Sequence, residues 1–364
     1  MINPLKFQWV LIFLSHANTY LSRKHLHMKL SLKKYVLPLK HTFSISRESH
    51  DFQDTLIACL SHRGKTGYGE ATSNPYYEIT TDTMKEEIGA IKTEIESFDF
   101  TTPEKFHAFL TAKKLSNFSI CALDLAAHDL YGKLLEKPLY AIWGTDISSY
   151  PITNYTIGLD TMEKMVEKIK EFPWPIYKIK LGTANDVAIV RELRKHTDSL
   201  FRVDANCAWT AEETIQNAPL LKELGVEFLE QPLKADDWKG MEQVFNHSVL
   251  PTIADESCIV ESDVEKCGLH YNGINIKLTK CGGLTPALRM INKGKEMGLK
   301  IMVGCMTESS VGISAIAQLV PQLDYVDMDG ALLLKEDIAD GIKILEHGKL
   351  IFPTLGGSGI TLKT

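Results

Sequence analysis

Three stretches of this chain decide the fold: FRVD at residues 201–204, FLEQP at residues 228–232 and TIADE at residues 252–256. Each stretch carries apolar residues up to an acid, and the acids Asp204, Glu230 and Asp255 follow one another at steps of 26 and 25 residues. About 25 residues is the length that one strand, one helix and two short loops require. In a (β/α)8 barrel every strand delivers its carboxyl end to the same face, so the spacing predicts such a barrel with three carboxylates at one pocket.

Two lysine-bearing runs flank these acids. The run YKIKL places Lys180 at 24 residues before Asp204, and the run INIKL places Lys277 at 22 residues after Asp255. Lys178 lies two positions before Lys180, and side chains two apart on a strand point to the same side. Repulsion between these two ammonium groups, added to a nearby divalent cation, is expected to favour the neutral amine that a general base needs.

Strand and helix patterns divide the chain into a small part and a large part. From residue 28 to 150, strand-like runs and helical patterns predict an α+β capping domain, in which residues 41–53 form the long loop of a hairpin. From residue 151 to 334, eight apolar runs, all but the last followed by a helical pattern, predict a modified TIM-type (β/α)8 barrel. Residues 335–364 are too few for a domain and are expected to pack back on the capping domain. The eight runs are ITNYTIG, IYKIKL, FRVD, VEFLEQ, PTIADES, GINIKL, KIMVGCM and DYVDMD.

Residues 1–27 differ in character from the rest of the chain. Their apolar run FQWVLIFL has eight residues, which is too short to span a membrane, and its flanks match a signal peptide poorly. The working chain is therefore expected to begin at Met28, with the preceding residues a mis-assigned start or a disordered tail.

Composition and charge argue against several classes of function. The formal net charge is −6 and no basic stripe interleaved with aromatic residues occurs, so nucleic-acid binding is not expected. The seven cysteines contain no CxxC pair and their number is odd, so we expect a reducing, cytoplasmic location without a disulfide framework or zinc ribbon. No membrane partner is expected, and the sequence is compatible with a homo-oligomer without setting the number of subunits.

Three carboxylates at the mouth of a barrel offer hard oxygen ligands to a metal ion. They are too few for a closed cage and suit an octahedral Mg²⁺ that keeps positions for substrate oxygens and water. A carboxylate substrate bound there becomes an enediolate when its α-carbon loses a proton, and the metal stabilises the added charge. With Lys180 on one face of the α-carbon and Lys277 on the other, one lysine removes the proton and the other returns it with inversion.

Each of these residues alone has an ordinary structural explanation. An acid at a strand end is commonly a helix N-cap, and a lysine there, such as Lys178 or Lys280, is mostly a surface charge. The joint pattern of three acids and two lysines on five consecutive strand ends makes a catalytic site the better interpretation.

Five motifs, YKIKLG, RVDANCAW, EFLEQPL, IADES and NIKLTKCGG, resemble the barrel motifs of the enolase superfamily, muconate-lactonizing subgroup, and the resemblance covers nearly the whole chain from Met28 onward. It implies that Lys180 and Lys277 are the acid/base catalysts and that Lys178 is the partner of Lys180. It also implies three Mg²⁺ ligands, Asp204, Glu230 and Asp255.

An acidic pair in the eighth run refines this prediction. In DYVDMDGALLL, Asp327 and Asp329 lie two apart and so share one face, where they would pair with a substrate ammonium group. The pair is similar to the motif of the dipeptide epimerases of the L-Ala-D/L-Glu type, in which the second Asp binds the dipeptide α-ammonium. The resemblance implies a small-molecule dipeptide substrate, epimerised at the α-carbon of its C-terminal residue. An N-acyl amino acid racemase, a muconate-type cycloisomerase and a barrel that binds a ligand without catalysis are the alternatives.

Substrate specificity is expected to depend on loops of the capping domain and on the seventh run. Arg47 in the segment 41–53 is a candidate partner for a substrate carboxylate, with a solvated loop arginine as the alternative. The other candidates are Tyr76 and Tyr77 in the segment 72–77, and Met306 and Thr307 with Glu308 behind them in GCMTESS.

Overall fold

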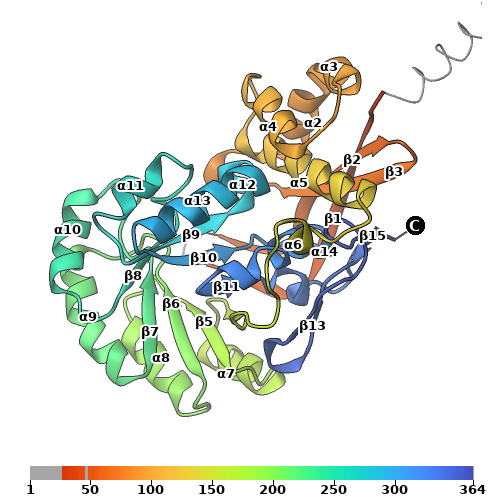
Figure 1. Cartoon of the computed structure of the whole chain (residues 1–364). Coiled ribbons are helices and arrows are strands. Elements are labelled where there is room, and N and C mark those ends of the chain that lie inside the picture. Colours follow the sequence, from red (N-terminus) through yellow and green to blue (C-terminus); the bar gives the residue numbers. More distant parts are fainter. Residues whose placement is uncertain (1–26, 46–47, 364) are drawn as a thin grey trace, which may run out of the picture.

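The computed structural model describes residues 27–45 and 48–363, and it contains an eight-stranded parallel sheet rolled into a barrel (Figure 1). The strands are β4 (Tyr155–Ile157), β5 (Ile176–Lys180), β6 (Leu200–Asp204), β7 (Val226–Glu230), β8 (Thr252–Ala254), β9 (Gly273–Lys277), β10 (Lys300–Gly304) and β11 (Tyr325–Asp327). Each strand pairs with the next one in the sequence, and a bridge between Thr153 and Val326 brings the two edges of the sheet together. The eight predicted runs and the barrel are confirmed.

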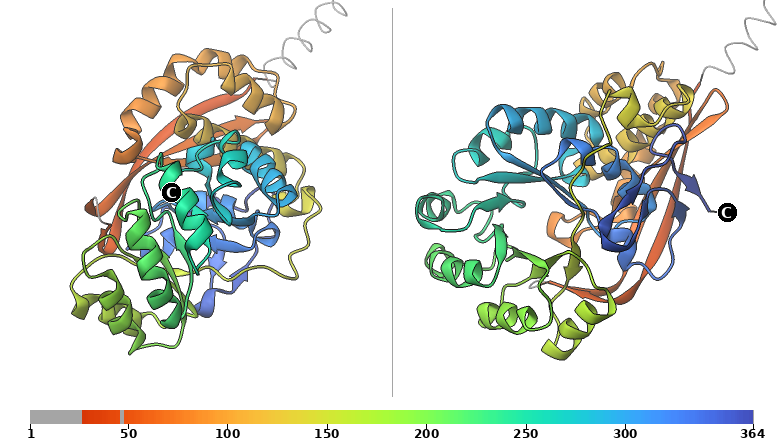
Figure 2. Two further views of the ribbon diagram at one scale, coloured as in Figure 1. Left: turned by 90° about the vertical axis from the view of Figure 1, so that its left-hand side faces the viewer. Right: turned by 60° about the horizontal axis from the view of Figure 1, so that its bottom comes forward.

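Helices cover the outer face of this barrel, as the further views show (Figure 2). Their apolar sides face the strands: the first of them, α7, buries Met165, Val166 and Ile169, while Lys164 and Glu167 are exposed. No helix in the described part of the chain is long and apolar enough to cross a membrane. In chain order, the helices of the barrel part are α7 (Met162–Glu171), α8 (Asp186–Arg194), α9 (Ala211–Glu223), α10 (Trp238–His247), α11 (Asp263–Cys267), α12 (Leu278–Cys281), α13 (Leu284–Glu296) and α14 (Ser310–Ala317), of which the short α12 lies at the mouth of the barrel.

The capping domain is a three-stranded antiparallel sheet with helices packed on it, in agreement with the α+β prediction. Its elements are β1 (Lys29–Ser44), β2 (Ser49–His62), β3 (Lys65–Thr72), α2 (Thr81–Ala90), α3 (Lys92–Ser97), α4 (Pro103–Thr111) and α5 (Asn117–Leu134). Helix α5 lies directly on β3, because Gly67 and Gly69 have no side chain to keep it away. A Cβ atom at either glycine would lie 2.1 Å from a carbonyl oxygen of α5. The last two glycines of GKTGYGEAT therefore allow the close approach of helix and sheet.

The hairpin of the capping domain is longer than the sequence suggests. Residues 41–53 were expected as a loop, but β1 continues to Ser44 and β2 begins at Ser49, with Phe43 opposite His50. Near the turn, the residues of both strands are exposed or only partly buried. Polar residues can therefore continue the pairing of the strands, and the sequence there does not alternate between apolar and polar residues. Thr42 and Asp51 even pair across the strands through a hydrogen bond of 2.6 Å. The expectation of a long loop is therefore wrong.

One predicted helical pattern, DTMKEEIGAIKTEIESF, forms two helices. α2 and α3 are separated at Ile91, whose backbone leaves helical geometry at φ −111° and ψ 13°. The apolar periodicity continues across the break, which is why the sequence suggests one helix.

The C-terminal residues form two small antiparallel pairs and return to the capping domain. Gly357 accepts a hydrogen bond from the Leu139 backbone N–H at 3.1 Å and donates one to the Lys137 carbonyl at 3.0 Å. The Ser358 N–H donates to Asp129 Oδ1 on α5 at 2.9 Å. The remaining elements are α6 (Leu139–Ile142), β12 (Ala339–Asp340), β13 (Lys343–Ile344), β14 (Leu350–Ile351), β15 (Thr361–Leu362) and the 3₁₀ turns η1 (Pro75–Tyr77), η2 (Val320–Gln322), η3 (Gly330–Leu333) and η4 (Glu346–Gly348).

Candidate active site

Asp204, Glu230 and Asp255 meet at the carboxyl ends of three adjacent strands. One carboxylate oxygen from each residue lies within 4.8 Å of the other two, and all three side chains are buried. Asp204 and Glu230 are direct partners in the register of β6 and β7, and Asp255 follows the last residue of β8. The structure therefore brings the three predicted metal ligands together.

The chemistry of this carboxylate cluster fits a hard cation. Glu230 Oε2 is buried and accepts no hydrogen bond from any described residue, although Lys178 Nζ lies 2.8 Å away. Burial and the nearby charge of Asp204 raise the pKa of Glu230 to about 8. A third negative charge is thus unfavourable in this cluster unless a cation compensates it. A donor set of carboxylate oxygens alone matches the preference of Mg²⁺.

Two of the predicted lysines reach the cluster from opposite sides. Lys180 Nζ lies 2.7 Å from Asp204 Oδ2, and Lys277 Nζ lies 2.9 Å from Asp255 Oδ2. Their strands, β5 and β9, are four places apart in the order of the eight-stranded sheet, which puts them across the barrel from each other. The carboxylate cluster lies between the two amines.

Lys178 lies deeper in the barrel than Lys180 and is surrounded by acids. Its Nζ is 2.8 Å from Glu230, 2.8 Å from Asp327 and 3.2 Å from Asp204. Burial would lower the pKa of Lys178, but these three carboxylates raise it well above its usual range. Repulsion from Lys180 is therefore outweighed at Lys178, which remains an ammonium group. In the same way, Asp255 raises the pKa of Lys277 against the effect of burial.

Lys280 belongs to the same cluster, so its interpretation as a surface charge is wrong. The helix α12 turns the chain inward directly after β9 and leaves Lys280 only 1% exposed. Its ammonium group lies 2.6 Å from Asp255 Oδ1 and also donates to the carbonyl oxygens of Asp255 and Asn275. Asp255 is held by Lys280 on one oxygen and by Lys277 on the other.

Gln231, which sequence reasoning did not single out, holds the backbone of Asp255. Its Oε1 accepts the N–H groups of Asp255 and Ser257 at 2.9 and 3.0 Å. Gln231 has a φ of +35°, and Asn206, two residues after Asp204, has a φ of +44°. Positive φ is uncommon outside glycine and is concentrated at functional sites. The motif EQP carried the only sequence signal for this arrangement.

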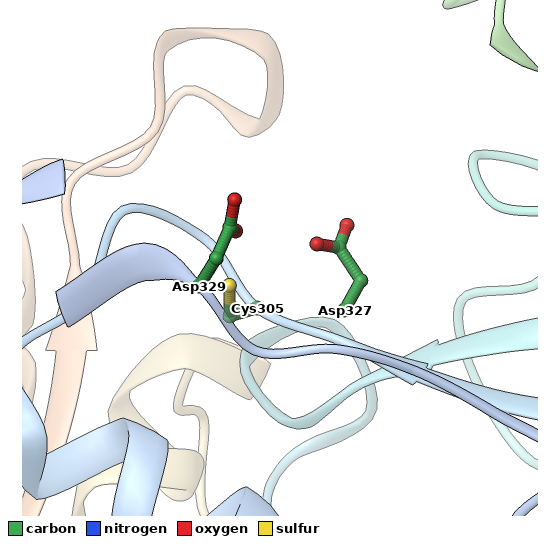
Figure 3. A group of neighbouring side chains, drawn as sticks. All are labelled: Cys305, Asp327 and Asp329. Carbon is green, nitrogen blue, oxygen red and sulfur yellow. The ribbon is translucent and has the colours of Figure 1, made fainter. Parts of the chain in front are cut away.

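The acidic pair of the eighth strand lies beside the cluster. The carboxylates of Asp327 and Asp329 project to the same side of the chain, with Cys305 next to Asp329 (Figure 3). One ligand atom from each of these three residues lies within 4.8 Å of the others. Burial raises the pKa of the Cys305 thiol well above its usual range, so the thiolate that a metal requires is unfavourable here.

The two acids of this pair have different partners. Asp327 accepts hydrogen bonds from Lys178 at 2.8 Å and from the Asn154 amide at 2.7 Å. Asp329 accepts one from the Thr156 backbone N–H at 2.6 Å. Burial and the charge of Asp327 raise the pKa of Asp329 to about 7. Asp327 is therefore paired with Lys178, whereas Asp329 has no paired cation among the described residues and could bind one.

A cavity of about 100 Å³ lies between the capping domain and the mouth of the barrel. The predicted specificity residues Tyr76, Tyr77, Met306 and Thr307 line it, whereas Glu308 lies behind and accepts the Met306 N–H at 2.8 Å. Arg47 lies outside the described residues. The wall also contains Lys180, Lys277, Asp255, Asp327 and Asp329.

The hairpin adds wall residues that sequence reasoning missed. Phe43, Glu48 and His50 line the cavity, and the rings of Phe43 and His50 lie 5.7 Å apart across the two strands. His50 Nε2 is buried without a hydrogen-bond partner among the described residues. Because the segment was interpreted as a loop, its alternating residues were not assigned to a face.

The carboxylate cluster, with a lysine on either side of it at the mouth of a barrel, agrees with the result of comparison with known proteins. Residues 160–364 match the family described as enolase C-terminal domain-like. The chain belongs to this family. Its resemblance to the enolase superfamily is thereby confirmed.

Several known proteins resemble the chain over nearly all of its length. It is 78% identical over 335 residues to the L-Ala-D/L-amino acid epimerase of a Maribacter species, covering 92% of this chain and 99% of that one. It is 58% identical over 339 residues to the L-Ala-D/L-amino acid epimerase of Flavobacterium johnsoniae, covering 92% and 100%. The dipeptide epimerase of Enterococcus faecalis, complexed with Mg and L-Leu-L-Tyr, superposes with a TM-score of 0.85 at 28% identity, covering 92% and 99%. This family member is therefore an isomerase of the epimerase type.

Proposed function

We propose that this family member epimerises dipeptides at the α-carbon of the C-terminal residue, with Mg²⁺ as cofactor. The proposal rests above all on the placement of Lys180 and Lys277 on opposite sides of one carboxylate cluster. The two relatives at 78% and 58% identity are L-Ala-D/L-amino acid epimerases, which supports dipeptides with N-terminal alanine as the substrate class.

Asp204, Glu230 and Asp255 are the residues that would hold the metal ion. When bound, Mg²⁺ compensates the charge of the cluster and stabilises negative charge that develops on a substrate carboxylate. The buried Glu230 Oε2, which accepts no hydrogen bond although Lys178 Nζ lies 2.8 Å away, supports this assignment, as does the Mg in the complex of the Enterococcus faecalis enzyme. Lys178 stays an ammonium group and keeps the carboxylates of Glu230 and Asp204 in place.

The two lysines exchange roles between the two directions of the reaction. The neutral amine on one side accepts the α-proton, and the electron pair of the broken C–H bond stays on the substrate. The ammonium group on the other side donates a proton to the opposite face and forms the new C–H bond. Nothing is oxidised or reduced, and the configuration of the α-carbon is inverted.

Asp329 supports a substrate with a free α-ammonium group. Its carboxylate lines the cavity, and Thr156 is the only hydrogen-bond donor that approaches it within the described residues. A charged ammonium group would supply the cation that the buried acid lacks. The substrates of an N-acyl amino acid racemase or a muconate-type cycloisomerase have no such group, so these alternatives leave Asp329 without a role.

The proposal is tested by incubating dipeptides of the form L-Ala-X with the enzyme and Mg²⁺ in deuterated water and recording mass and configuration. We expect one deuterium at the α-carbon of X in the inverted product. Lys180→Ala and Lys277→Ala should each abolish inversion, while each still exchanges the isomer whose proton the remaining lysine removes. Exchange of the same isomer by both variants would contradict the two-lysine assignment. Absence of exchange from every dipeptide with the parent enzyme would contradict the substrate class.

A further inference from the structure

A carboxylate of the capping domain caps the N-terminus of a helix of the barrel. Helix α13 begins at Leu284 behind Gly283, which offers no side chain to cap it, and its first turn contains no acid. Asp124 on α5 supplies the missing acceptor, because its Oδ2 accepts the Thr285 N–H at 2.9 Å and its Oδ1 accepts the Thr285 hydroxyl at 2.7 Å. A negative charge at this position also matches the positive end of the helix.

The contact between Asp124 and the start of α13 requires a glycine at position 283. Gly283 has a φ of +113°, which side-chain-bearing residues rarely adopt, and a Cβ atom on it would lie 2.4 Å from Asp124 Oδ2. His128, one turn further along α5, lies 2.9 Å through Nε2 from the same Thr285 hydroxyl. The second glycine of the motif KCGG is therefore required by the approach of the capping domain.

The helix capped in this way follows closely on Lys277. Only α12 and the two glycines of KCGG separate β9, which ends in Lys277, from α13. Helix α5 contacts the near end of this connection as well, because the Asn117 amide donates to the Lys280 carbonyl at 2.7 Å. The same Lys280 binds Asp255 through its ammonium group. Helix α5 thus holds both ends of the segment 278–285.

We infer that Asp124 is a positioning residue for Lys277, through which the capping domain sets the geometry of one of the two proton-transferring amines. The inference rests on the proposed function, because it assigns Lys277 to one face of the α-carbon. Asp124 touches neither Lys277 nor the cavity. It acts by fixing the start of α13 and with it the segment that follows β9.

The same helix offers a matched control. Asp129 is also fully buried on α5, and its carboxylate accepts the backbone N–H groups of Tyr68 and Ser358 and pairs with Lys133 at 2.7 Å. These partners lie in the capping domain and the C-terminal segment, away from Lys277. Replacing Asp129 perturbs a buried carboxylate of equal size without touching the segment 278–285.

The test compares Asp124→Asn with Asp129→Asn. Asparagine keeps the size of aspartate but offers a single acceptor oxygen, so one of the two Thr285 donors loses its partner. Burial raises the pKa of Asp124 to about 7, so the measurements are made at higher pH, where the parent carboxylate is ionised. We expect Asp124→Asn to lower kcat/KM by about 10- to 100-fold, because a displacement of a reacting group by about 1 Å slows the reaction by about that factor.

The exchange pattern identifies the lysine that is affected. Because the equilibrium constant is unchanged, kcat/KM falls by the same factor in both directions and cannot distinguish Lys277 from Lys180. If return of the proton by Lys277 becomes slow, the isomer deprotonated by Lys180 regains a proton from Lys180 instead. That isomer should then accumulate deuterium before it inverts. The isomer is defined independently as the one that Lys277→Ala still exchanges.

We expect Asp124→Asn to accumulate deuterium in this isomer alone, and Asp129→Asn to show the parent pattern at a similar loss of thermal stability. The inference is overturned if Asp124→Asn keeps the parent pattern, or if Asp129→Asn changes it equally. A Lys277→Ala variant that exchanged neither isomer would instead count against the proposed function, so the two failures are distinguishable. If Asp124→Asn folds poorly, Thr285→Ser, which keeps both donors, and Thr285→Val, which removes the hydroxyl, provide the same comparison from the barrel side.

Discussion

Glu230 is the acid of the cluster whose ionisation is least favourable. Burial and Asp204 raise its pKa to about 8, whereas lysine contacts lower the pKa of Asp204 to about 2 against the effect of burial. The folded chain therefore binds a proton on Glu230 at pH values at which the unfolded chain has lost it. With a folded pKa above the unfolded value, the free energy of unfolding falls as the pH rises through the interval between them.

This difference predicts a pH dependence of stability that Mg²⁺ reverses. Without metal, the unfolding temperature should fall between about pH 6.5 and pH 8, with Asp124 and Glu308 contributing in the same sense because burial raises their pKa values to about 7 and 8. At lower pH two buried histidines act in the opposite sense, because burial lowers their pKa values to about 4 and 3. Mg²⁺ should restore the unfolding temperature most at the upper end of this interval, where Glu230 must be ionised to bind it. Glu230→Gln should flatten the slope and remove most of the response to Mg²⁺, as measured by thermal unfolding with and without the ion. Glu242→Gln, on an exposed side of α10, is the control, and a parent slope of opposite sign would refute the argument.

The proposed role of Asp329 predicts that the substrate has a free ammonium group. Asp329→Asn should lower kcat/KM for free dipeptides by about 10- to 150-fold, because a charge-assisted hydrogen bond contributes about 1.5 to 3 kcal/mol. N-acetylated dipeptides should be poor substrates of the parent enzyme and should lose little more in the variant. Asp327→Asn is the matched comparison, since Asp327 pairs with Lys178 and its loss should slow both kinds of substrate alike. Equal parent activity on free and acetylated dipeptides would argue against the dipeptide assignment.

The strand residues of the site could be predicted from sequence because each one lies at the end of an apolar run or two residues before it. Lys178, Lys180, Asp204, Glu230 and Lys277 are all within their strands, so their direction follows from the alternation of a β-strand. Lys280 and Gln231 lie beyond the strands, and their direction depends on the turn of α12 and on a positive φ. Neither feature has a periodic signature in the sequence.

At the scale of elements, the barrel strands were predictable, whereas the hairpin of the capping domain was predicted with strands that are too short. Strands buried on both faces are continuous apolar runs, which stand out in any sequence. The far part of the β1–β2 hairpin is exposed or only partly buried, and there polar residues fit the strand geometry as well as apolar ones would. The wall residues Phe43 and His50 belong to this part, which explains why the side of the pocket formed by the hairpin was harder to predict than the side formed by the barrel strands.

Contacts between the capping domain and the barrel cannot be predicted from the sequence of any single helix or strand. Glu70 on β3 accepts the Ser309 N–H at 3.1 Å and the Gly312 N–H at 2.9 Å, at the start of the barrel helix α14. Asp124 does the same for α13. The loop before α14 lines the cavity through Met306 and Thr307, whereas α13 follows Lys277, which lines it from the end of β9. The buried acids of the capping domain thus accept N–H groups at the starts of two barrel helices, from residues more than 150 positions away in the sequence.

At the scale of the whole molecule, α5 is where the capping domain, the barrel and the C-terminal segment meet. The barrel contacts it through Asp124 and the C-terminal segment through Asp129, five residues later. Figure 1 shows the end of the chain returning beside the strands with which the described part begins. The C-terminal segment therefore packs against the capping domain near the start of the described chain, although it contains none of the site residues.

This arrangement predicts a large stability cost at Gly357. The residue has a φ of +76°, and a Cβ atom on it would lie 2.2 Å from Asp129 Oδ1 and 2.4 Å from the Asp129 carbonyl oxygen. Gly64, in the turn between β2 and β3, has the same φ of +76° with no atom within 4 Å of the added Cβ. Gly64→Ala should therefore cost about 1 kcal/mol from backbone strain alone. Gly357→Ala should cost about 2 to 4 kcal/mol, because the clash with α5 adds to that strain.

Urea unfolding of the two variants beside the parent measures both costs, and the difference between them isolates the contact of the C-terminal segment with α5. At a temperature at which each variant is folded, kcat/KM should stay within about 3-fold of the parent value, because the contact is remote from the cavity and such sites act independently. Equal costs at the two glycines would mean that the C-terminal segment yields to the added methyl group and does not hold α5. A loss of activity in Gly357→Ala alone would instead show that the contact at Asp129 is coupled to the site through the helix.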